Sequence, residues 1–225
     1  MAAGLNRVTW GLTYPGPATF PGMVLWGAST TGPAALPGSY EVRLTVDGQT
    51  QTQPLRVRTH PLRAVSDADL REQFDLAMRI RDKVSEANNA VIHIRALKTQ
   101  IAVRLGKSPD AALKTAGDRL TQTLSSVEEE IYQVRNQSNQ DPLNFPIKIN
   151  NRLASLMRVV NTGDGKPIAN AEPIFTDLSG ELKNQTDRLQ EILVGDVRAF
   201  NEELRRLQLE VLSVAPPAPP GSPPK

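Results

Sequence analysis

Residues 66–106 read SDADLREQFDLAMRIRDKVSEANNAVIHIRALKTQIAVRLG, the longest helical pattern in the chain. Apolar side chains recur in it at alternating spacings of three and four residues, a period typical of an amphipathic helix. They are Ile80, Val84, Ala87, Val91, Ile94, Ile101 and Leu105, with Lys98 at one expected apolar position. Ser66 is placed to cap this helix, and Gly106 to end it in a left-handed conformation. A helix of about 40 residues is roughly 60 Å long, so its stripe needs partner helices.

Three more helical patterns follow. The second begins at Ser108-Pro109, as N-cap and first residue, and its stripe consists of Leu113, Ala116, Leu120, Leu124, Val127, Ile131 and Val134. The third is short, over residues 146–160. The fourth extends from Pro173 to about Leu212, with Gly180 and Gly195 as candidate bends. Because only a short turn joins the first two helices, we predict an antiparallel bundle of three long helices and one short helix over residues 61–214.

Residues 1–60 predict β-structure. In Gly38–Val46, Tyr40, Val42, Leu44 and Val46 alternate with polar residues, which is typical of a half-buried antiparallel strand. Asp47-Gly48 is a strong hairpin signal. The return strand is Gln49–Arg58, with Leu55 and Val57 facing inward. Since Pro54 lacks a donor, this strand is expected at an edge or bulged.

Two further strands are expected, at Leu5–Trp10 and Met23–Trp26, with Tyr14 and Phe20 packed onto the sheet. Three or four strands make about half of an Ig-like sandwich. The predicted fold class is therefore α+β, a partial Ig-like antiparallel β-sandwich followed by the helical bundle. A strand that starts at Leu5 further suggests that the chain is a fragment of a longer protein, and leaves open whether Met1 is its natural start.

The amino-acid composition excludes several classes of function. The 225 residues carry a net charge of +2 and no cysteine, which excludes disulfides, thiolate nucleophiles and cysteine metal sites and gives no strong field for nucleic acid. Asn6 and Arg7 interrupt any signal peptide. Residues 8–40 lack charges but hold five prolines, so we expect no membrane span. The Pro-rich tail, residues 215–225, is predicted to be disordered.

Candidate chemistry is sparse. His60 and His93 have no second histidine or carboxylate cluster at ligand spacing, and His93 is expected on the flank of its helix. Glu128–Glu130 fan out around a helix, so we interpret them as a solvated face rather than a glycosidase pair. Residues 163–166 (GDGK) match neither a phosphate loop nor a calcium loop and are interpreted as a turn. We predict no catalytic, metal or cofactor residue in this chain, and leave its ligand-binding residues open.

Two surface patterns have alternatives. His93, Arg95, Lys98, Arg104 and Lys107 could form a nucleic-acid stripe, but no nearby aromatic could stack a base and cations also suit a helix C-terminus. Four aromatics could line a sugar site, although aromatics on a small β-domain are usually core; they are Trp10, Tyr14, Trp26 and Tyr40. We favour the structural interpretation for both.

Three stretches carry a family resemblance: residues 4–16 (GLNRVTWGLTYPG), 36–44 (LPGSYEVRL) and 141–153 (DPLNFPIKINNRL). With residues 73–76 and 88–91, they resemble the C-terminal region of large exported bacterial proteins that carry a sortilin-like or sialidase-like β-propeller and are classed as glycosyl hydrolases. The first two stretches are also similar to the Ig-like module of flagellar hook-capping proteins. The resemblance extends over nearly all of the chain before its tail.

The resemblance implies a non-catalytic accessory or interaction region of an exported, periplasmic or extracellular propeller protein. Its partners would be the upstream propeller domain and a protein or glycan. Any glycosidase residues would lie in that propeller, so none is carried over. Two alternatives stay open: a stand-alone helical oligomerisation or scaffold module, whose long stripes pair between chains as in a coiled coil, and a glycan-acting hydrolase fragment.

Overall fold

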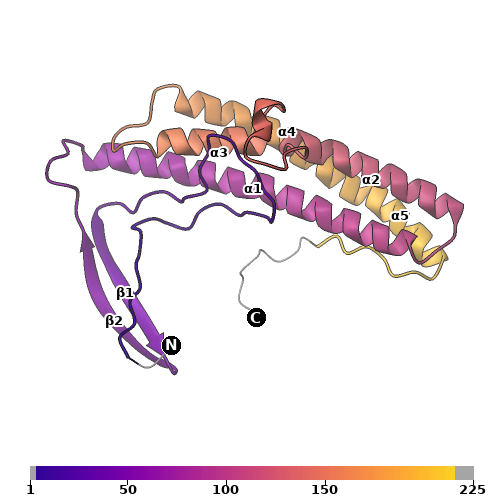
Figure 1. The fold of residues 1–225 in the computed structure, drawn as a ribbon, viewed down its shortest axis with the longest axis horizontal. Coiled ribbons are helices and arrows are strands. Elements are labelled where there is room, and N and C mark those ends of the chain that lie inside the picture. The colour runs from indigo at the N-terminus through magenta and orange to yellow at the C-terminus, as the bar shows by residue number, and fades with distance from the viewer. Residues whose placement is uncertain (1–3, 216–225) are drawn as a thin grey trace.

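The computed structural model describes residues 4–215 of the chain as an α+β fold, a two-stranded antiparallel sheet followed by helices (Figure 1). The elements are β1 (Gly38–Val46), β2 (Gln49–Val57), α1 (Asp67–Leu105), α2 (Ala111–Ile131), a short 3₁₀ helix (Asp141–Leu143), α3 (Ile149–Val160), α4 (Ala171–Val194) and α5 (Asp196–Arg206). The prediction of disorder for the tail falls outside the described residues from position 216 onward.

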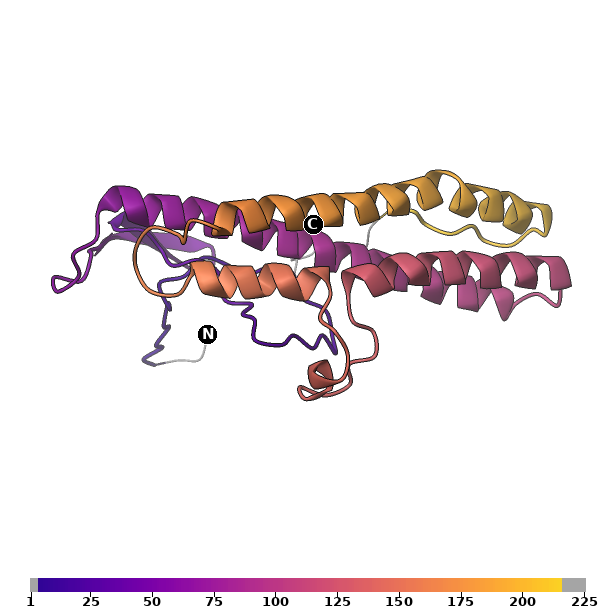
Figure 2. The same cartoon turned by 90° about the horizontal axis from the view of Figure 1, so that it is seen from above.

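The helices form three rods, in which α1 and the α4–α5 rod run in one direction and the α2–α3 rod runs in the opposite direction (Figure 2). α1 spans the length of the bundle, and α4 and α5 follow one another along a second rod. α2 and α3 lie end to end and share the third rod, so α2 packs on the second half of α1 and α3 on its first half. This arrangement explains why three shorter helices suffice to cover one long apolar stripe.

The core consists of the predicted stripes. Ile80, Val84, Ala87, Val91, Ile94 and Ile101 of α1 are buried, as are Leu113, Leu120, Leu124, Val127 and Ile131 of α2. Buried groups of α3 to α5 continue the cluster, among them Leu153, Met157, Leu182, Leu189, Phe200 and Leu204. Val134, predicted as part of the α2 stripe, is exposed because α2 has already ended at Ile131.

The structure confirms one of the predicted helix caps and corrects two others. Ser66 caps α1, and its hydroxyl accepts a hydrogen bond from the Asp69 N–H at 3.1 Å. The left-handed cap predicted at Gly106 is wrong: this residue is right-handed, at φ −67° and ψ −15°. The cap predicted at Ser108 is also wrong. Asp110 caps α2 instead, because its carboxylate accepts from the Leu113 N–H at 2.7 Å, which suits the positive end of a helix.

The last two predicted helices differ from the structure at their ends. α3 begins at Ile149, not at Pro146, whose carbonyl accepts a hydrogen bond from Gln133. The fourth helix begins at Ala171 and is broken at Gly195, which lies at φ −95° and ψ −80°, outside the helical region. α5 then ends at Arg206 rather than near Leu212. Gly180, the other candidate bend, lies within α4.

The β part is smaller than predicted. β1 and β2 form the only sheet in residues 4–215, and neither Leu5–Trp10 nor Met23–Trp26 is a strand. Elsewhere a single bridge joins Thr13 to Ala34. Residues 4–215 therefore contain one hairpin and no β-sandwich. Residues 5–10 have a strand-like pattern but no neighbouring strand to bond, and Leu5 is 96% exposed.

Residues 18–27, here called the N-terminal strap, lie on the bundle and contain a turn at Pro21-Gly22 (Figure 1). Side chains take the place of a neighbouring strand. The Asn151 amide accepts from the Trp26 N–H at 2.7 Å and donates to the Trp26 carbonyl at 2.8 Å, and Asn88 donates to the Ala18 carbonyl at 2.7 Å. Helices therefore satisfy the backbone groups that a sheet would otherwise bond.

Phe20 packs onto this bundle rather than onto the sheet, which corrects the prediction, whereas Tyr14 contacts both α1 and Tyr40 of β1. The Tyr14 ring lies edge-on to Phe74, with ring centroids 5.0 Å apart. Phe20 meets Tyr132 in the same manner, also at 5.0 Å. Tyr14 and Phe20 thus anchor the first part of the chain to the bundle.

Residues 207–215, here called the C-terminal strap, return along the bundle after α5. Asn201 clamps Leu212 as Asn151 clamps Trp26: its amide accepts from the Leu212 N–H at 2.7 Å and donates to the carbonyl at 3.1 Å. Gln100 accepts from the Ser213 N–H at 2.8 Å. Arg104 donates to the Glu210 carbonyl at 2.9 Å. This strap covers the second half of α1.

Candidate interaction surface on the hairpin

The turn between β1 and β2 has the geometry that its sequence requires. Asp47 and Gly48 both have positive φ, at 50° and 78°, as a type I′ turn demands at its two central residues. The register runs without a bulge from Val46 opposite Gln49 to Gly38 opposite Val57. The hairpin prediction is therefore confirmed, and Pro54 fits into β2 opposite Glu41 without interrupting the ladder.

One face of β1, here called the apolar β1 face, consists of Tyr40, Val42, Leu44 and Val46. The sequence predicts a half-buried strand, in which this face is the buried one. Instead Val42 is 51% exposed and Leu44 is 46% exposed. Within residues 4–215 neither strand packs against a helix, and the hairpin projects away from the bundle (Figure 1). The strand is amphipathic, as predicted, but nothing in the described part of the chain covers most of its apolar face.

The apolar β1 face is anchored at its inner end. The Trp10 ring lies edge-on to Tyr40, with centroids 5.6 Å apart, and the Tyr40 hydroxyl donates to the Leu36 carbonyl at 2.7 Å. Burial raises the pKa of this hydroxyl above its ordinary value, and the nearby Tyr14 hydroxyl raises it further. Tyr40 therefore acts as a neutral hydrogen-bond donor that fixes the base of the hairpin.

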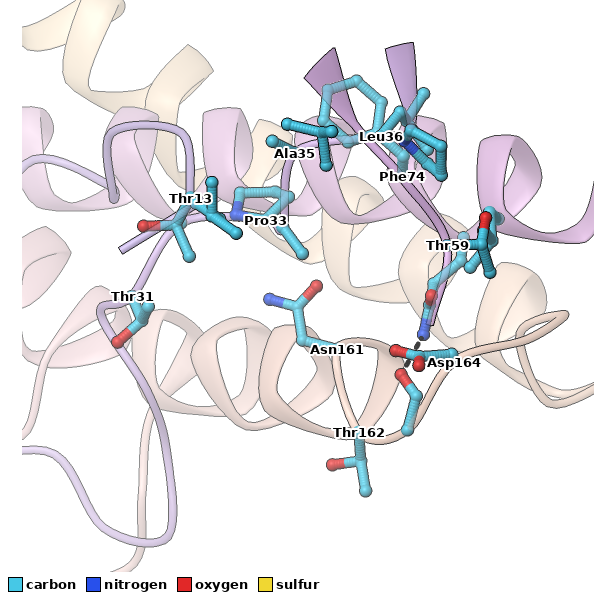
Figure 3. A pocket seen from close by; sticks show the side chains of 18 of the residues that line it. Thr13, Thr31, Pro33, Ala35, Leu36, Thr59, Phe74, Asn161, Thr162 and Asp164 are labelled. Atoms are coloured by element: carbon cyan, nitrogen blue, oxygen red, sulfur yellow. Dashed lines mark hydrogen bonds between the residues drawn. The ribbon is translucent and has the colours of Figure 1, made fainter. Parts of the chain in front are cut away.

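A pocket of about 510 Å³ lies at this base, between the hairpin, the loop at residues 29–37, the start of α1 and the loop after α3 (Figure 3). Leu36, Phe74 and Pro33 supply apolar walls, and Asn161 and Asp164 supply polar groups. Asp164, its only carboxylate, forms an ion pair with Arg63. The pocket therefore offers no pair of carboxylates for acid–base hydrolysis.

Two predicted candidates lie at this pocket. Residues 163–166 form the predicted turn, with positive φ at Gly163 and Gly165. Gln73 of α1 donates to the Gly163 carbonyl at 3.1 Å and fixes this turn. His60 lines the pocket, and its ring accepts from the Leu62 N–H at 3.3 Å. His60 therefore has a local structural partner.

The other histidine lies elsewhere. His93 is about 28 Å along α1 from Phe74 of the pocket, at 1.5 Å per residue, so the structure does not bring the two histidines together. His93 is buried rather than on a flank. Burial lowers the pKa of His93 below its ordinary value, and a hydrogen bond with the Val214 backbone opposes this shift. Its Nε2 atom has no partner among the described residues.

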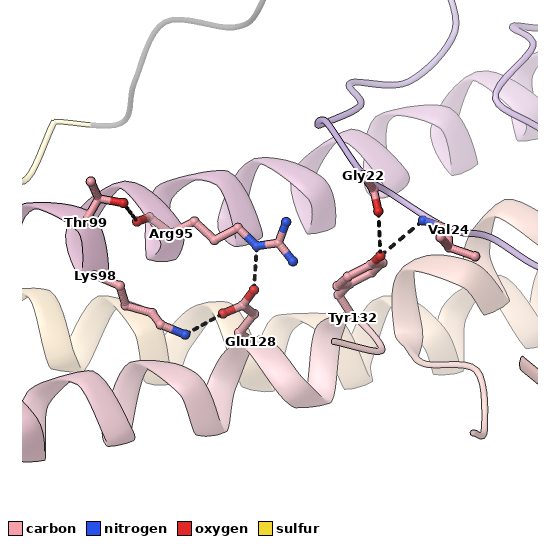
Figure 4. Close-up of polar contacts among 7 residues, drawn as sticks. All are labelled: Gly22, Val24, Arg95, Lys98, Thr99, Glu128 and Tyr132. Carbon is pink, nitrogen blue, oxygen red and sulfur yellow. Dashed lines mark hydrogen bonds and ion pairs between the residues drawn. The ribbon is translucent and has the colours of Figure 1, made fainter. Parts of the chain in front are cut away.

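Glu128 is the clearest error of the sequence interpretation (Figure 4). It belongs not to a solvated face but to the helix interface, where its side chain is 4% exposed. Arg95 and Lys98 of α1 donate to its two carboxylate oxygens at 2.6 and 3.0 Å. The Arg95 guanidinium also lies 4.7 Å from the centroid of Phe20. One buried carboxylate thus connects α1, α2 and the N-terminal strap.

The same contacts explain the basic stripe of α1. Arg95 and Lys98 are bound to Glu128, and Arg104 is buried and paired with Glu210 of the C-terminal strap at 2.9 Å. His93 is buried as well. Four of the five cationic positions of the predicted stripe therefore have structural roles inside the bundle.

Sequence reasoning did not assign roles to the asparagines that hold the straps. They are Asn88, Asn151 and Asn201, which are all buried, and Asn150 donates to the Asn88 amide oxygen at 3.0 Å. A signal was present, since asparagine is rarely buried in a helix unless both ends of its amide are bonded. However, their partners are backbone groups in distant loops, which periodicity does not reveal.

The described residues, 4–215, hold no cluster of three His, Asp or Glu side chains suited to a metal ion. None of their helices combines the length and hydropathy needed to cross a membrane. Comparison with protein-family models, with curated proteins and with solved structures finds no significant match to this chain.

Proposed function

We propose that this chain is a non-catalytic interaction module, an accessory region of an exported β-propeller protein of the glycosyl-hydrolase-like type. In this proposal the helical bundle is the support and the hairpin is the recognition element. The observation that carries it is the exposed apolar β1 face on a hairpin that projects from the bundle. The link to a propeller protein, and with it export, rests on the resemblance of residues 4–16, 36–44 and 141–153 alone.

The hairpin by itself lacks what a stable sheet requires. A lone two-stranded hairpin is marginal in water unless its apolar face is covered. Trp10 covers Tyr40 at the inner end, while Val42, Leu44 and Val46 remain at least 41% exposed. A second β-layer packed over these three residues would complete an Ig-like sandwich in the usual face-to-face manner. The partner for this face is therefore β-structure, which the propeller protein supplies.

The bundle suits the role of a support. Its core is continuous along all three rods, and both straps are clamped by buried amides. Tyr40 and Trp10 then fix the hairpin base relative to it. A rigid base lets a projecting hairpin present its face at low entropic cost on binding.

The test is binding of the separately produced propeller domain of one such parent protein, titrated by calorimetry into the 225-residue chain. We expect binding that Leu44→Lys abolishes, because the charge would be buried at the new interface. Val103→Lys is the matched control, since Val103 of α1 is exposed to nearly the same degree, 44% against 46%. Absence of binding would refute the propeller assignment. Equal loss in both variants would refute the role of the hairpin.

A further inference from the structure

We propose that the outer edge of β1 pairs with the same edge of a second copy of this chain, antiparallel, about a two-fold axis at Val42. The product is a four-stranded sheet, β2-β1-β1-β2. This inference rests on the proposed role of the hairpin as recognition element and names a partner for its edge, whereas the proposed function concerns its face. Edge and face can be occupied at the same time.

The turn determines which backbone groups point outward. In a hairpin with two central residues, the flanking residues form a hydrogen-bonded pair, here Val46 and Gln49. Hydrogen-bonded and non-hydrogen-bonded pairs then alternate along the ladder. The residues whose N–H and C=O groups face away from the partner strand are Ser39, Glu41, Arg43 and Thr45 on β1, and Thr50, Thr52, Pro54 and Arg56 on β2.

The two edges are therefore unequal. Pro54 lies at an outward-facing position, so it leaves the β1–β2 ladder intact but removes a donor from the middle of the β2 edge. The β1 edge keeps all of its donors and acceptors. Its residues are exposed along the whole strand apart from Tyr40, which is partly buried. An added strand consequently finds a complete row of partners only on β1.

The β1 edge is complementary to itself in charge. Glu41 and Arg43 lie symmetrically on either side of Val42, the central residue of Gly38–Val46. In an antiparallel pair centred there, Glu41 lies opposite the partner's Arg43, and Arg43 lies opposite the partner's Glu41. Both positions point their backbone groups toward the new strand, so they also form its hydrogen-bonded pairs. Arg43 and Glu41 already form an ion pair within one chain, at 3.1 Å, so the dimer would contain a square of alternating charges.

Neighbouring registers are disfavoured. A slip of two residues in one direction places Glu41 opposite the partner's Glu41, and a slip in the other direction places Arg43 opposite the partner's Arg43. Like charges directly opposite each other destabilise a strand pair. A slip of one residue would turn the apolar face to the other side. The sequence thus favours the register centred at Val42 over the neighbouring registers.

The same register joins the apolar faces. Val42 lies opposite the partner's Val42, and Tyr40 lies opposite the partner's Leu44. On this face β2 carries Gln49, Gln51 and Gln53 opposite Val46, Leu44 and Val42. The apolar residues therefore lie at the β1 rim of each hairpin and at the centre of the four-stranded sheet, where cross-strand pairs contribute most.

The test is sedimentation velocity of the full 225-residue chain from micromolar to millimolar concentration. We expect a reversible dimer. Arg43→Pro removes an outward donor and should raise the dimer dissociation constant by at least about tenfold. Thr52→Pro is the matched control, because Thr52 lies opposite Arg43 but faces the other edge; it should leave dimerisation unchanged. Circular dichroism checks that each variant keeps its helices.

A charge exchange gives a test that does not depend on proline. Glu41→Arg and Arg43→Glu should each remain monomeric, because each places like charges opposite one another. Mixed together, the two variants should form a heterodimer. A chain that stays monomeric at millimolar concentration, or a dimer that ignores these substitutions, overturns the inference. If such a monomer still binds the propeller domain through Leu44, the proposed function stands; if the dimer forms and the propeller does not bind, the proposed function fails alone.

Discussion

The bundle and the hairpin use the same device, an amphipathic repeat, with opposite outcomes. In α1, Val84, Ile94 and Leu97 recur on one stripe and all are fully buried. In β1, Val42, Leu44 and Val46 recur on one face and all are at least 41% exposed. The difference lies in the partners. α1 packs against the other two rods of the bundle, whereas β1, apart from its pairing with β2, meets aromatic side chains at its Tyr40 end, those of Trp10 and Tyr14. Apolar periodicity thus identifies a face that requires cover but not what covers it.

The largest contrast should appear on truncating one leucine in each region. Leu97→Ala leaves a cavity in a closed core and should lower the free energy of unfolding by about 3 kcal/mol. Leu44→Ala removes a side chain that is already half in water and should cost less than about 0.5 kcal/mol. Urea denaturation of the two variants measures both. Similar costs would mean that the hairpin is covered in solution.

The ion-pair cluster of the bundle should give the next effect. Glu128→Gln keeps the shape but removes the charge that binds Arg95 and Lys98, and should cost about 1–2 kcal/mol because both cations retain some contact with water. Glu129→Gln, one residue further on an exposed position, should stay within about 0.5 kcal/mol of the wild type. Thermal unfolding compares them, and equal melting temperatures would contradict the role of Glu128.

The strap clamps should produce a smaller and more local effect. Asn151→Ala removes both hydrogen bonds to Trp26 and should cost about 1 kcal/mol. Amide hydrogen exchange should accelerate in residues 18–27 and leave residues 207–215 unchanged, whereas Asn201→Ala should do the reverse. Asn89→Ala, at an exposed position of α1, is the control. Acceleration spread evenly over the chain would show that the straps do not act separately.

The pH dependence should be the smallest effect and belong to the bundle. Because burial lowers the pKa of His93, the unfolded chain takes up a proton at a pH where the fold does not. Stability is therefore fully present above the ordinary histidine pKa of about 6.5 and falls as the pH falls below it. His93→Gln should remove this decline between neutral and mildly acidic pH, while His60→Gln should not. Chemical denaturation across that range measures the difference.

The sequence predicts those parts of the fold whose signals are local. The Asp47-Gly48 turn needs only its own two residues, and the Ser66 cap and α1 stripe need one helical period. Leu5–Trp10 shows the limit, since its strand-like pattern cannot make a strand without a neighbour to bond. Met23–Trp26 shows the same limit, because the backbone of Trp26 is bonded by the side chain of Asn151 and not by a neighbouring strand.

The apolar β1 face and the Glu128 ion-pair cluster likewise show which features a local sequence pattern predicts and which it does not. The apolar β1 face could be read from alternation, but its exposure depends on the missing contact between hairpin and helices. Glu128 could not be assigned, because a run of three glutamates fans out around α2 and only the packed bundle shows which one meets Arg95 and Lys98. Tertiary pairing, and not periodicity, decides both.

The break at Gly195 has a consequence for the length of the α4–α5 rod. Buried residues follow one another at Leu189, Ile192, Val197 and Phe200, so one step of five residues stands where three or four are regular. In an unbroken helix, that extra residue would rotate α5 about the helix axis by about 100°. The apolar side of α5 would then no longer face the core. Gly195 leaves the helical region for one residue and absorbs the phase slip. A rod built in this way can gain or lose a residue at its joint while the core on either side keeps its pattern.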